Sequence, residues 1–297
     1  YRPILGVFCV STSMLPFVTV VICAYTRQRL GDLVQGATQA HHQLIDLIAT
    51  GEVAGGEVMV VIDHNDELLT EVQAVLGAWA RVVANSRTPG LSGARNTAVI
   101  AAVLSDIVVF LDDDACPQPG WLAALLQPYA DSSVLGVGGA AEPVWPAGGR
   151  PGHLPAARSN RGEFDWVVGC TYAGQPDRLS AVRNLMGCNM SFRRVVFDRV
   201  GGFAEDLGRV GTVPLGCEET ELCIRAGQDQ PQGRILFEPA ACVWHRVTEQ
   251  RTSWHYFWSR CHAEGISKAA VVTKVSAASA LATERSYVRT TLPRGLG

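Results

Sequence analysis

Three consecutive aspartates, Asp112, Asp113 and Asp114, follow the apolar run 107–111. The run predicts a buried strand, and carboxylates at the end of a buried strand are costly unless a cation or ligand hydroxyls neutralise them. Side chains two apart on an extended chain point the same way, so Asp112 and Asp114 can share one site. Oxygen ligands suit Mg²⁺ or Mn²⁺ better than zinc. The cluster therefore predicts a divalent cation site, and a solvated turn between a strand and a helix is the alternative.

Asp63 also ends an apolar run, at the close of the second predicted strand. In nucleotide-binding sheets an acid at this place commonly accepts hydrogen bonds from ribose hydroxyls or from a base N–H. Capping the helix that follows is the alternative role. Residues 90–96 (GLSGARN) then open a helix, with Ser92 as its expected N-cap and Arg95 as a bidentate donor to an anion.

Two further groups carry titratable chemistry. Glu218, Glu219 and Glu221 stand at the start of a predicted helix, where the helix dipole stabilises acids. One of these carboxylates could instead act as a general base. His245 follows the apolar run 240–244 and is either a packing residue or a metal ligand.

The bulk properties set limits on the class of protein. A chain of 297 residues with 47% hydrophobic content can build one large α/β domain or two closely packed halves. The net charge of −3 does not indicate a nucleic-acid surface, so we expect no nucleic-acid partner. Nine cysteines without a CxxC spacing predict reduced thiols in a cytoplasmic protein.

The hydrophobic pattern alternates strands with amphipathic helices from residue 17 to about residue 130. This alternation is typical of a parallel sheet with helices on both faces. Prolines and glycines in 144–161 predict a long loop, and a second block of elements follows. The predicted strands are 17–24, 57–63, 81–84, 107–111, 189–192, 235–237 and 241–244, and the predicted helices are 30–49, 67–79, a helix from 92, 120–129, 194–200, 218–226 and a helix from 252.

The two ends of the chain raise the question of membranes. Residues 4–24 are uncharged and largely apolar, but Pro16 interrupts them and their second half favours a buried strand. The chain begins at Tyr1 without a charged leader, which suggests a segment of a longer protein. Residues 265–297 carry five cations and one acid, so this segment could lie on an anionic membrane or form a solvated helix.

The ordered set of motifs resembles the family 2 glycosyltransferases over roughly residues 17–265. The resemblance implies a GT-A fold, which is an α/β fold with a Rossmann-like, mostly parallel central sheet flanked by helices. It also implies a nucleotide-sugar-binding half at 1–135, an acceptor and catalytic half at 136–250 and a helical C-terminal extension at 251–297. The matching segments are 20–25 (VVICAY), 61–63 (VID), 93–96 (GARN), 110–114 (FLDDD), 187–194 (GCNMSFRR), 201–203 (GGF), 218–222 (EETEL) and 243–245 (VWH).

The resemblance also implies a role for each matching residue. The family transfers a sugar from a nucleotide-diphosphate donor, most often linked to UDP, with inversion and with Mn²⁺ or Mg²⁺. Glu219 matches the catalytic base, and Glu218 precedes it as an expected donor contact. Asp114 matches the metal ligand, and His245 matches a histidine that completes the metal or diphosphate site in several members. The expected nucleotide and sugar contacts are Ala24, Tyr25, Asp63, Arg95, Asp112, Asp113 and Asn189.

Two departures from the family pattern qualify the function. Glu218-Glu219 stands where the family usually has Glu-Asp, so the expected base is one methylene longer. The QxxRW segment is absent, and residues 254–265 occupy its place, which favours single transfers over processive synthesis. A retaining GT-A enzyme and an inactive nucleotide- or glycan-binding protein are the alternatives. The acceptor hydroxyl stays open between a lipid-linked glycan, a cell-wall precursor and a small molecule. The basic C-terminal segment favours peripheral contact with the inner face of the membrane.

Overall fold

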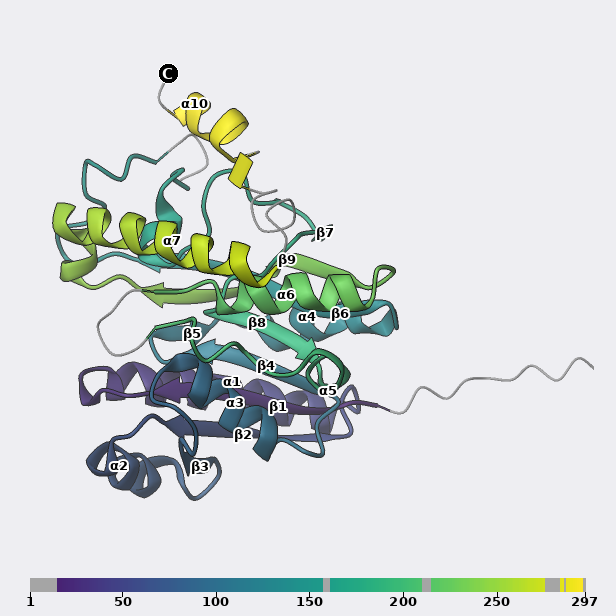
Figure 1. Cartoon of the computed structure of the whole chain (residues 1–297). Coiled ribbons are helices and arrows are strands. Elements are labelled where there is room, and N and C mark those ends of the chain that lie inside the picture. The colour runs from purple at the N-terminus through teal and green to yellow at the C-terminus, as the bar shows by residue number, and fades with distance from the viewer. Residues whose placement is uncertain (1–14, 157–160, 210–214, 276–283, 286, 296–297) are drawn as a thin grey trace, which may run out of the picture.

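The structure, a computed structural model, describes residues 15–156, 161–209, 215–275, 284–285 and 287–295. Within these residues one mixed sheet has the strand order β3-β2-β1-β4-β8-β6-β9-β5, and β7 pairs with β9 (Figure 1). Helices cover both faces of this sheet, and α7 and α10 lie beyond its upper end (Figure 1). The α/β architecture expected from the sequence is confirmed.

The first half of the sheet is parallel, as the alternation of elements predicts. β1 pairs with both β2 and β4, and the register sets Cys23 opposite Asp112 and Ala24 opposite Ile62. The carboxyl ends of these strands therefore meet at one edge. The elements are β1 (Phe17–Ala24), η1 (Arg27–Arg29), α1 (Leu30–Ala49), β2 (Gly55–Ile62), α2 (Asp66–Leu76), β3 (Arg81–Ala84), α3 (Leu91–Ala101) and β4 (Ile107–Asp112).

The second half of the sheet is mixed. β8 runs antiparallel to both β4 and β6, whereas β6 and β9 are parallel. The sequence did not predict β6, because three glycines within it weaken the strand signal. The two strands expected at 235–244 form one strand with an irregular register. The elements are β5 (Ala115–Pro117), α4 (Trp121–Leu126), η2 (Gln127–Ala130), β6 (Val134–Val144), η3 (Asp165–Val168), β7 (Ser180–Ala181), β8 (Asn189–Arg193), α5 (Arg194–Val200), α6 (Glu218–Asp229) and β9 (Arg234–Arg246).

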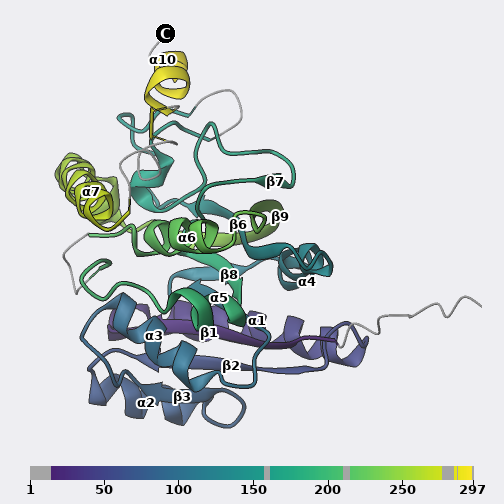
Figure 2. The same cartoon turned by 45° about the vertical axis from the view of Figure 1, so that its right-hand side comes forward.

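The C-terminal part is helical where it is described. η4 (Glu249–Thr252) leads into α7 (Trp254–Lys274), and the side chain of Ser253 caps α7 by accepting a hydrogen bond from the Tyr256 N–H. α7 lies beside α6. Figure 2 shows α7 almost end-on. η5 (Tyr287–Thr291) and α10 (Leu292–Gly295) follow. Among the described helices, none combines the length and the apolar character that a membrane span requires.

The central strands are buried on both faces, which explains their continuous apolar sequence. Val20 and Ile22 pack against α1, α2 and α4 on one face, whereas Val21, Met59 and Phe110 pack against α3, α5 and α6 on the other. The sheet is therefore a rigid support for the polar residues that follow its strands.

Asn189 ties the second half of the sheet together from within. Its amide nitrogen donates hydrogen bonds to the carbonyl oxygens of Ala140 and Ala241, at 2.9 Å and 2.8 Å. Its oxygen accepts a hydrogen bond from the Trp121 indole at 2.8 Å. The side chain is fully buried. The expectation that Asn189 contacts the donor is therefore corrected: its polar atoms are occupied by β6, β9 and α4.

We expect Asn189→Ala to lower the free energy of unfolding by about 2–4 kcal/mol, because three buried polar partners lose their hydrogen bonds. Urea denaturation measures this change. The exposed Gln73 on α2 is the control, and Gln73→Ala is expected to change stability by less than about 0.5 kcal/mol. Equal stabilities for the two variants would contradict the structural role of Asn189.

Candidate active site

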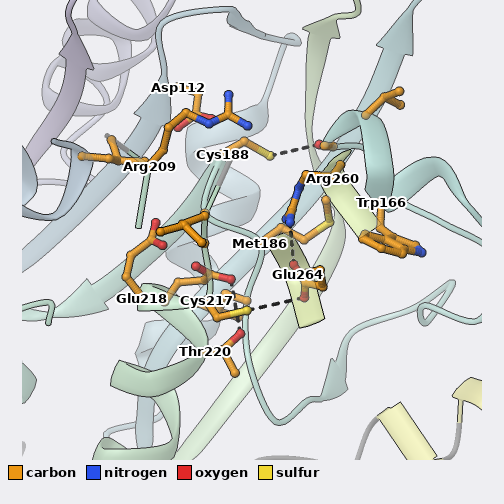
Figure 3. Close-up of a pocket in the computed structure, with 18 of the residues that line it drawn as sticks. Asp112, Trp166, Met186, Cys188, Arg209, Cys217, Glu218, Thr220, Arg260 and Glu264 are labelled. Atoms are coloured by element: carbon orange, nitrogen blue, oxygen red, sulfur yellow. Dashed lines mark hydrogen bonds and ion pairs between the residues drawn. The ribbon is translucent and has the colours of Figure 1, made fainter. Parts of the chain in front are cut away.

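A cavity of about 380 Å³ opens at the carboxyl ends of β1, β2 and β4. Its other walls come from the segment 166–188, from the start of α6 and from α7, as Figure 3 shows in part. Most of the residues expected from the sequence line this cavity. They are Ala24, Tyr25, Asp63, Arg95, Asp112, Asp113, Glu218, Glu219 and His245.

Asp112, Asp114 and His245 form a candidate cation site. Each offers one ligand atom, and these atoms lie within 4.8 Å of one another. The antiparallel pairing of β5 with β9 sets Ala115 opposite His245, which brings the histidine to the aspartates. His245 Nε2 lies 3.1 Å from Asp114 Oδ1. Two carboxylates and an imidazole suit Mn²⁺ or Mg²⁺. The spacing in the sequence paired Asp112 with Asp114, whereas the resemblance gave Asp114 with His245, and the structure brings all three together.

The state of Asp114 fits this interpretation. Both of its carboxylate oxygens are buried and neither accepts a hydrogen bond. Burial disfavours the charge, but His245, Arg251 and Arg29 outweigh it and hold the pKa of Asp114 well below its usual range. Arg251 lies 3.1 Å and Arg29 lies 3.2 Å from Asp114 Oδ2. Asp114 is therefore an ionised carboxylate held in place by His245, Arg251 and Arg29, and an ionised carboxylate is the form that ligates a cation.

Asp113 lies in a different environment. Its Oδ1 accepts a hydrogen bond from Arg29 at 2.7 Å, and its Oδ2 is buried without a partner among the described residues. Burial, opposed by Arg29 and helped by Asp114, raises the pKa of Asp113 to about 7. The three aspartates therefore differ in role, although they are adjacent in the sequence.

Arg95 is fully buried, and its guanidinium donates hydrogen bonds to three acceptors, one on α6, one in the segment before β8 and one at the end of β4. It donates to Glu218 Oε1 at 2.6 Å and to the Gly187 carbonyl at 2.8 Å. It also lies 3.4 Å from Asp112 Oδ1. The rings of Phe110 and Phe203 pack against its guanidinium. Arg95 therefore joins α3, α6 and β4 in the wall of the cavity.

The start of α3 differs from the expectation. Its N-cap is Gly90, at φ 121°, which is a conformation that favours glycine. Ser92 instead donates a hydrogen bond to the Leu207 carbonyl at 2.7 Å. Asp63 Oδ2 accepts the Gly90 N–H at 2.9 Å, so it holds the turn before α3. The capping alternative for Asp63 is wrong, because Asn65 caps α2.

Glu219 is half-buried at the first turn of α6 and faces the cavity. Burial and the neighbouring Glu218 raise the pKa of Glu219 to about 8, and Arg95 opposes this shift only in part. A carboxylate with a pKa near neutrality can accept a proton in the physiological range. The geometry and the electrostatics both fit a general base.

The sequence did not predict the charged wall opposite the strands. Arg260, Glu264 and Lys268 follow one another at i,i+4 spacing on α7, and each faces the cavity. Glu284 binds both Arg183 and Lys268, at 2.7 Å and 2.5 Å. The i,i+4 spacing was the signal that could have identified this face of α7. For Arg251 no signal was available, because only the fold brings η4 to Asp114.

Where they are described, the basic C-terminal residues lie in different environments. Lys268 lines the cavity, whereas Lys274 pairs with Asp206 at 2.7 Å. Arg285 and Arg289 are exposed, and the side chain of Arg294 lies outside the described residues. The structure therefore gives no support for a continuous basic patch.

Comparisons with known proteins identify the family. Residues 19–201 match the family described as "Glycosyl transferase family 2". A glucosyl-dolichyl phosphate glucuronosyltransferase from Haloferax volcanii is 30% identical over 254 residues, which are 84% of this chain and 76% of that protein. A pre-mycofactocin glycosyltransferase from Mycobacterium tuberculosis is 29% identical over 201 residues, 66% of this chain and 39% of that protein.

Two solved structures show the same fold. GalNAc-T7 with UDP, GalNAc and Mn²⁺ has a TM-score of 0.51 at 18% identity, and the match covers 78% of this chain and 44% of that one. This chain thus spans less than half of that protein's length. The mannosyltransferase PcManGT from Pyrobaculum calidifontis, with GDP-Man and Mn²⁺, has a TM-score of 0.50 at 20% identity. That match covers 92% of this chain and 76% of the mannosyltransferase chain. The fold is GT-A. The chain belongs to glycosyl transferase family 2 and is a glycosyltransferase.

The Arg95–Glu218 pair predicts a measurable coupling. We expect Arg95→Met to cost about 3–5 kcal/mol of stability, because it leaves Glu218 buried without its cation. Arg95→Met combined with Glu218→Gln is expected to cost less than the sum of the single changes. Arg81, half-exposed and 3.6 Å from Glu57, is the control, and Arg81→Met should cost less than about 1 kcal/mol. Additive effects in urea denaturation would show that the pair is not coupled.

Proposed function

We propose that this glycosyltransferase transfers a sugar from a UDP-linked donor to an acceptor hydroxyl in single, inverting and cation-dependent steps. The observation that carries the proposal is one cavity lined by both Glu219, with its raised pKa, and the Asp112–His245 part of the candidate cation site. Base and cation site come from different elements, α6 on one side and β4 with β9 on the other. The proposed transfer needs both the base and the cation, because one accepts the acceptor's proton and the other neutralises the departing diphosphate.

Different residues of the donor half are proposed to bind different parts of the nucleotide. Ala24, Tyr25 and Asp63 lie at the ends of β1 and β2 and offer contacts to the base and the ribose. A bound divalent cation, held by Asp112, Asp114 and His245, would neutralise charge on the departing diphosphate. Manganese and UDP accompany the GalNAc-T7 structure, which supports this choice of donor and metal.

Glu219 is proposed to act on the acceptor. Its ionised carboxylate takes the proton of the acceptor hydroxyl as the oxygen attacks the anomeric carbon, and the bond to the diphosphate oxygen breaks. Attack opposite the leaving group inverts the configuration. A proton NMR assay of the product anomer separates this pathway from a retaining one.

The acceptor is proposed to be lipid-linked. The Haloferax relative is named for a glucosyl-dolichyl phosphate acceptor and a glucuronosyl group. We therefore propose a cytoplasmic enzyme that meets a lipid-linked glycan at the inner face of the membrane. UDP-glucuronic acid and UDP-glucose are the first donors to compare.

Changing Glu219 to glutamine should lower kcat by about 10²–10⁴-fold and leave UDP affinity unchanged, because only proton transfer is lost. Steady-state kinetics and calorimetry with UDP measure the two effects. Glu219→Asp keeps the charge with a shorter reach, so intermediate activity is expected. In the parent enzyme, the rate should rise with pH through about 8 as Glu219 ionises, and this rise should be absent from the glutamine variant. An unchanged kcat would exclude Glu219 as the base.

Changing Asp114 to asparagine should weaken Mn²⁺-dependent UDP binding by at least about 100-fold, since a direct ligand counts for more than its outer-shell partners. Titration calorimetry with UDP, with Mn²⁺ or with EDTA, measures this dependence. Asp113→Asn is the matched control, because Asp113 lies outside the three-residue group and should keep the Mn²⁺ effect. If UDP bound the parent protein equally well in EDTA, the cation site would be refuted.

A further inference from the structure

Arg209 differs from the other cations that line the cavity. The rest have an acidic partner: Arg29 with Asp113, Arg95 with Glu218, Arg183 with Glu284, Arg251 with Asp114, and Arg260 and Lys268 with Glu264. In the described part of the chain, no acid lies within salt-bridge distance of the Arg209 side chain. All 28 Asp and Glu residues fall in that part, so no aspartate or glutamate outside it can supply the partner.

The backbone holds Arg209 in place at the cavity wall. Its carbonyl accepts the Leu91 N–H at 2.9 Å, and the Leu207 carbonyl accepts the Ser92 hydroxyl. Gly208, at φ +93°, packs so closely that an added Cβ would lie 2.7 Å from Ser92 Oγ and 3.2 Å from Glu218 Oε2. The segment is thus fixed between the starts of α3 and α6. In Figure 3, Arg209 lies in the part of the cavity that also holds Asp112.

A half-buried guanidinium without a counter-ion is costly unless a ligand supplies the negative charge. Arginine offers a planar fork of donors that matches carboxylate and phosphate oxygens. A nucleotide sugar brings such groups to the cavity: the diphosphate always, and a carboxylate where the sugar is a uronic acid. The other cations in the wall already have partners in the protein.

We infer that Arg209 is a donor-binding residue that pairs with an anionic group of the nucleotide sugar. The inference rests on the proposed function, because it assumes that this cavity takes the donor. The fixed backbone gives Arg209 a defined position. A contact with the diphosphate would serve every donor of this class, whereas a contact with a sugar carboxylate would favour donors that carry a uronic acid.

The test is titration calorimetry with Mn²⁺ and three probes: UDP, UDP-glucose and UDP-glucuronic acid. Arg209→Gln is expected to raise the Kd of at least one probe by about 10- to 100-fold, the range for a lost charged hydrogen bond. Arg209→Lys keeps the positive charge but loses the planar pair of donors, so its Kd should lie between those of the parent protein and of Arg209→Gln. Arg178→Gln is the matched control, because Arg178 is exposed and outside the cavity wall.

The three probes distinguish the two sources of negative charge. An equal loss for all three probes places Arg209 on the diphosphate, whereas a loss confined to UDP-glucuronic acid places it on the sugar carboxylate. Unchanged Kd values for all three, in a variant with the parent's thermal stability, would overturn the inference while the proposed function stands. A parent protein that binds none of the probes would refute the proposed function and the inference together.

Discussion

The site depends on the hydrogen bonds and ion pairs that the buried guanidinium of Arg95 makes. This guanidinium reaches Glu218 on α6, the Gly187 carbonyl before β8 and Asp112 at the end of β4. Its charge allows acidic residues from distant parts of the chain to stand together at the edge of an apolar sheet. Such a group is stable only when its geometry and its charges are nearly complete, since each unpaired buried charge is costly.

The carboxylates of the site have different properties. Asp114, surrounded by His245, Arg251 and Arg29, has a pKa held well below its usual range, whereas burial beside Glu218 raises that of Glu219 to about 8. Carboxyl groups whose environments move their pKa values apart can take different roles, one as a permanent anion and the other as a proton acceptor. This division fits a cation ligand behind the cavity wall and a general base that faces the cavity.

The α7 wall of the cavity has a different balance of charge. α7 presents Arg260, Glu264 and Lys268, and the C-terminal segment adds Glu284. These cations and acids neutralise each other within the protein, whereas Arg209 is left for a ligand. The cavity therefore combines charges that neutralise each other on the α7 side with Arg209, a cation without an acidic partner, on the side that holds Asp112.

The sequence by itself determined the parallel first half and the acids at its strand ends, because continuous apolar runs and helices with one apolar face are local signals. β1, α1 and β3 have the predicted bounds, and Asp63, Asp112 and Glu219, which the sequence singled out, line one cavity. Only the tertiary structure decided that Asn189 belongs to the core, that Gly90 caps α3 and that Arg251 reaches Asp114. It also decided that Arg209 faces the cavity without an acidic partner. Those facts depend on contacts between residues far apart in the chain, and such contacts leave no periodic pattern in the sequence around either partner.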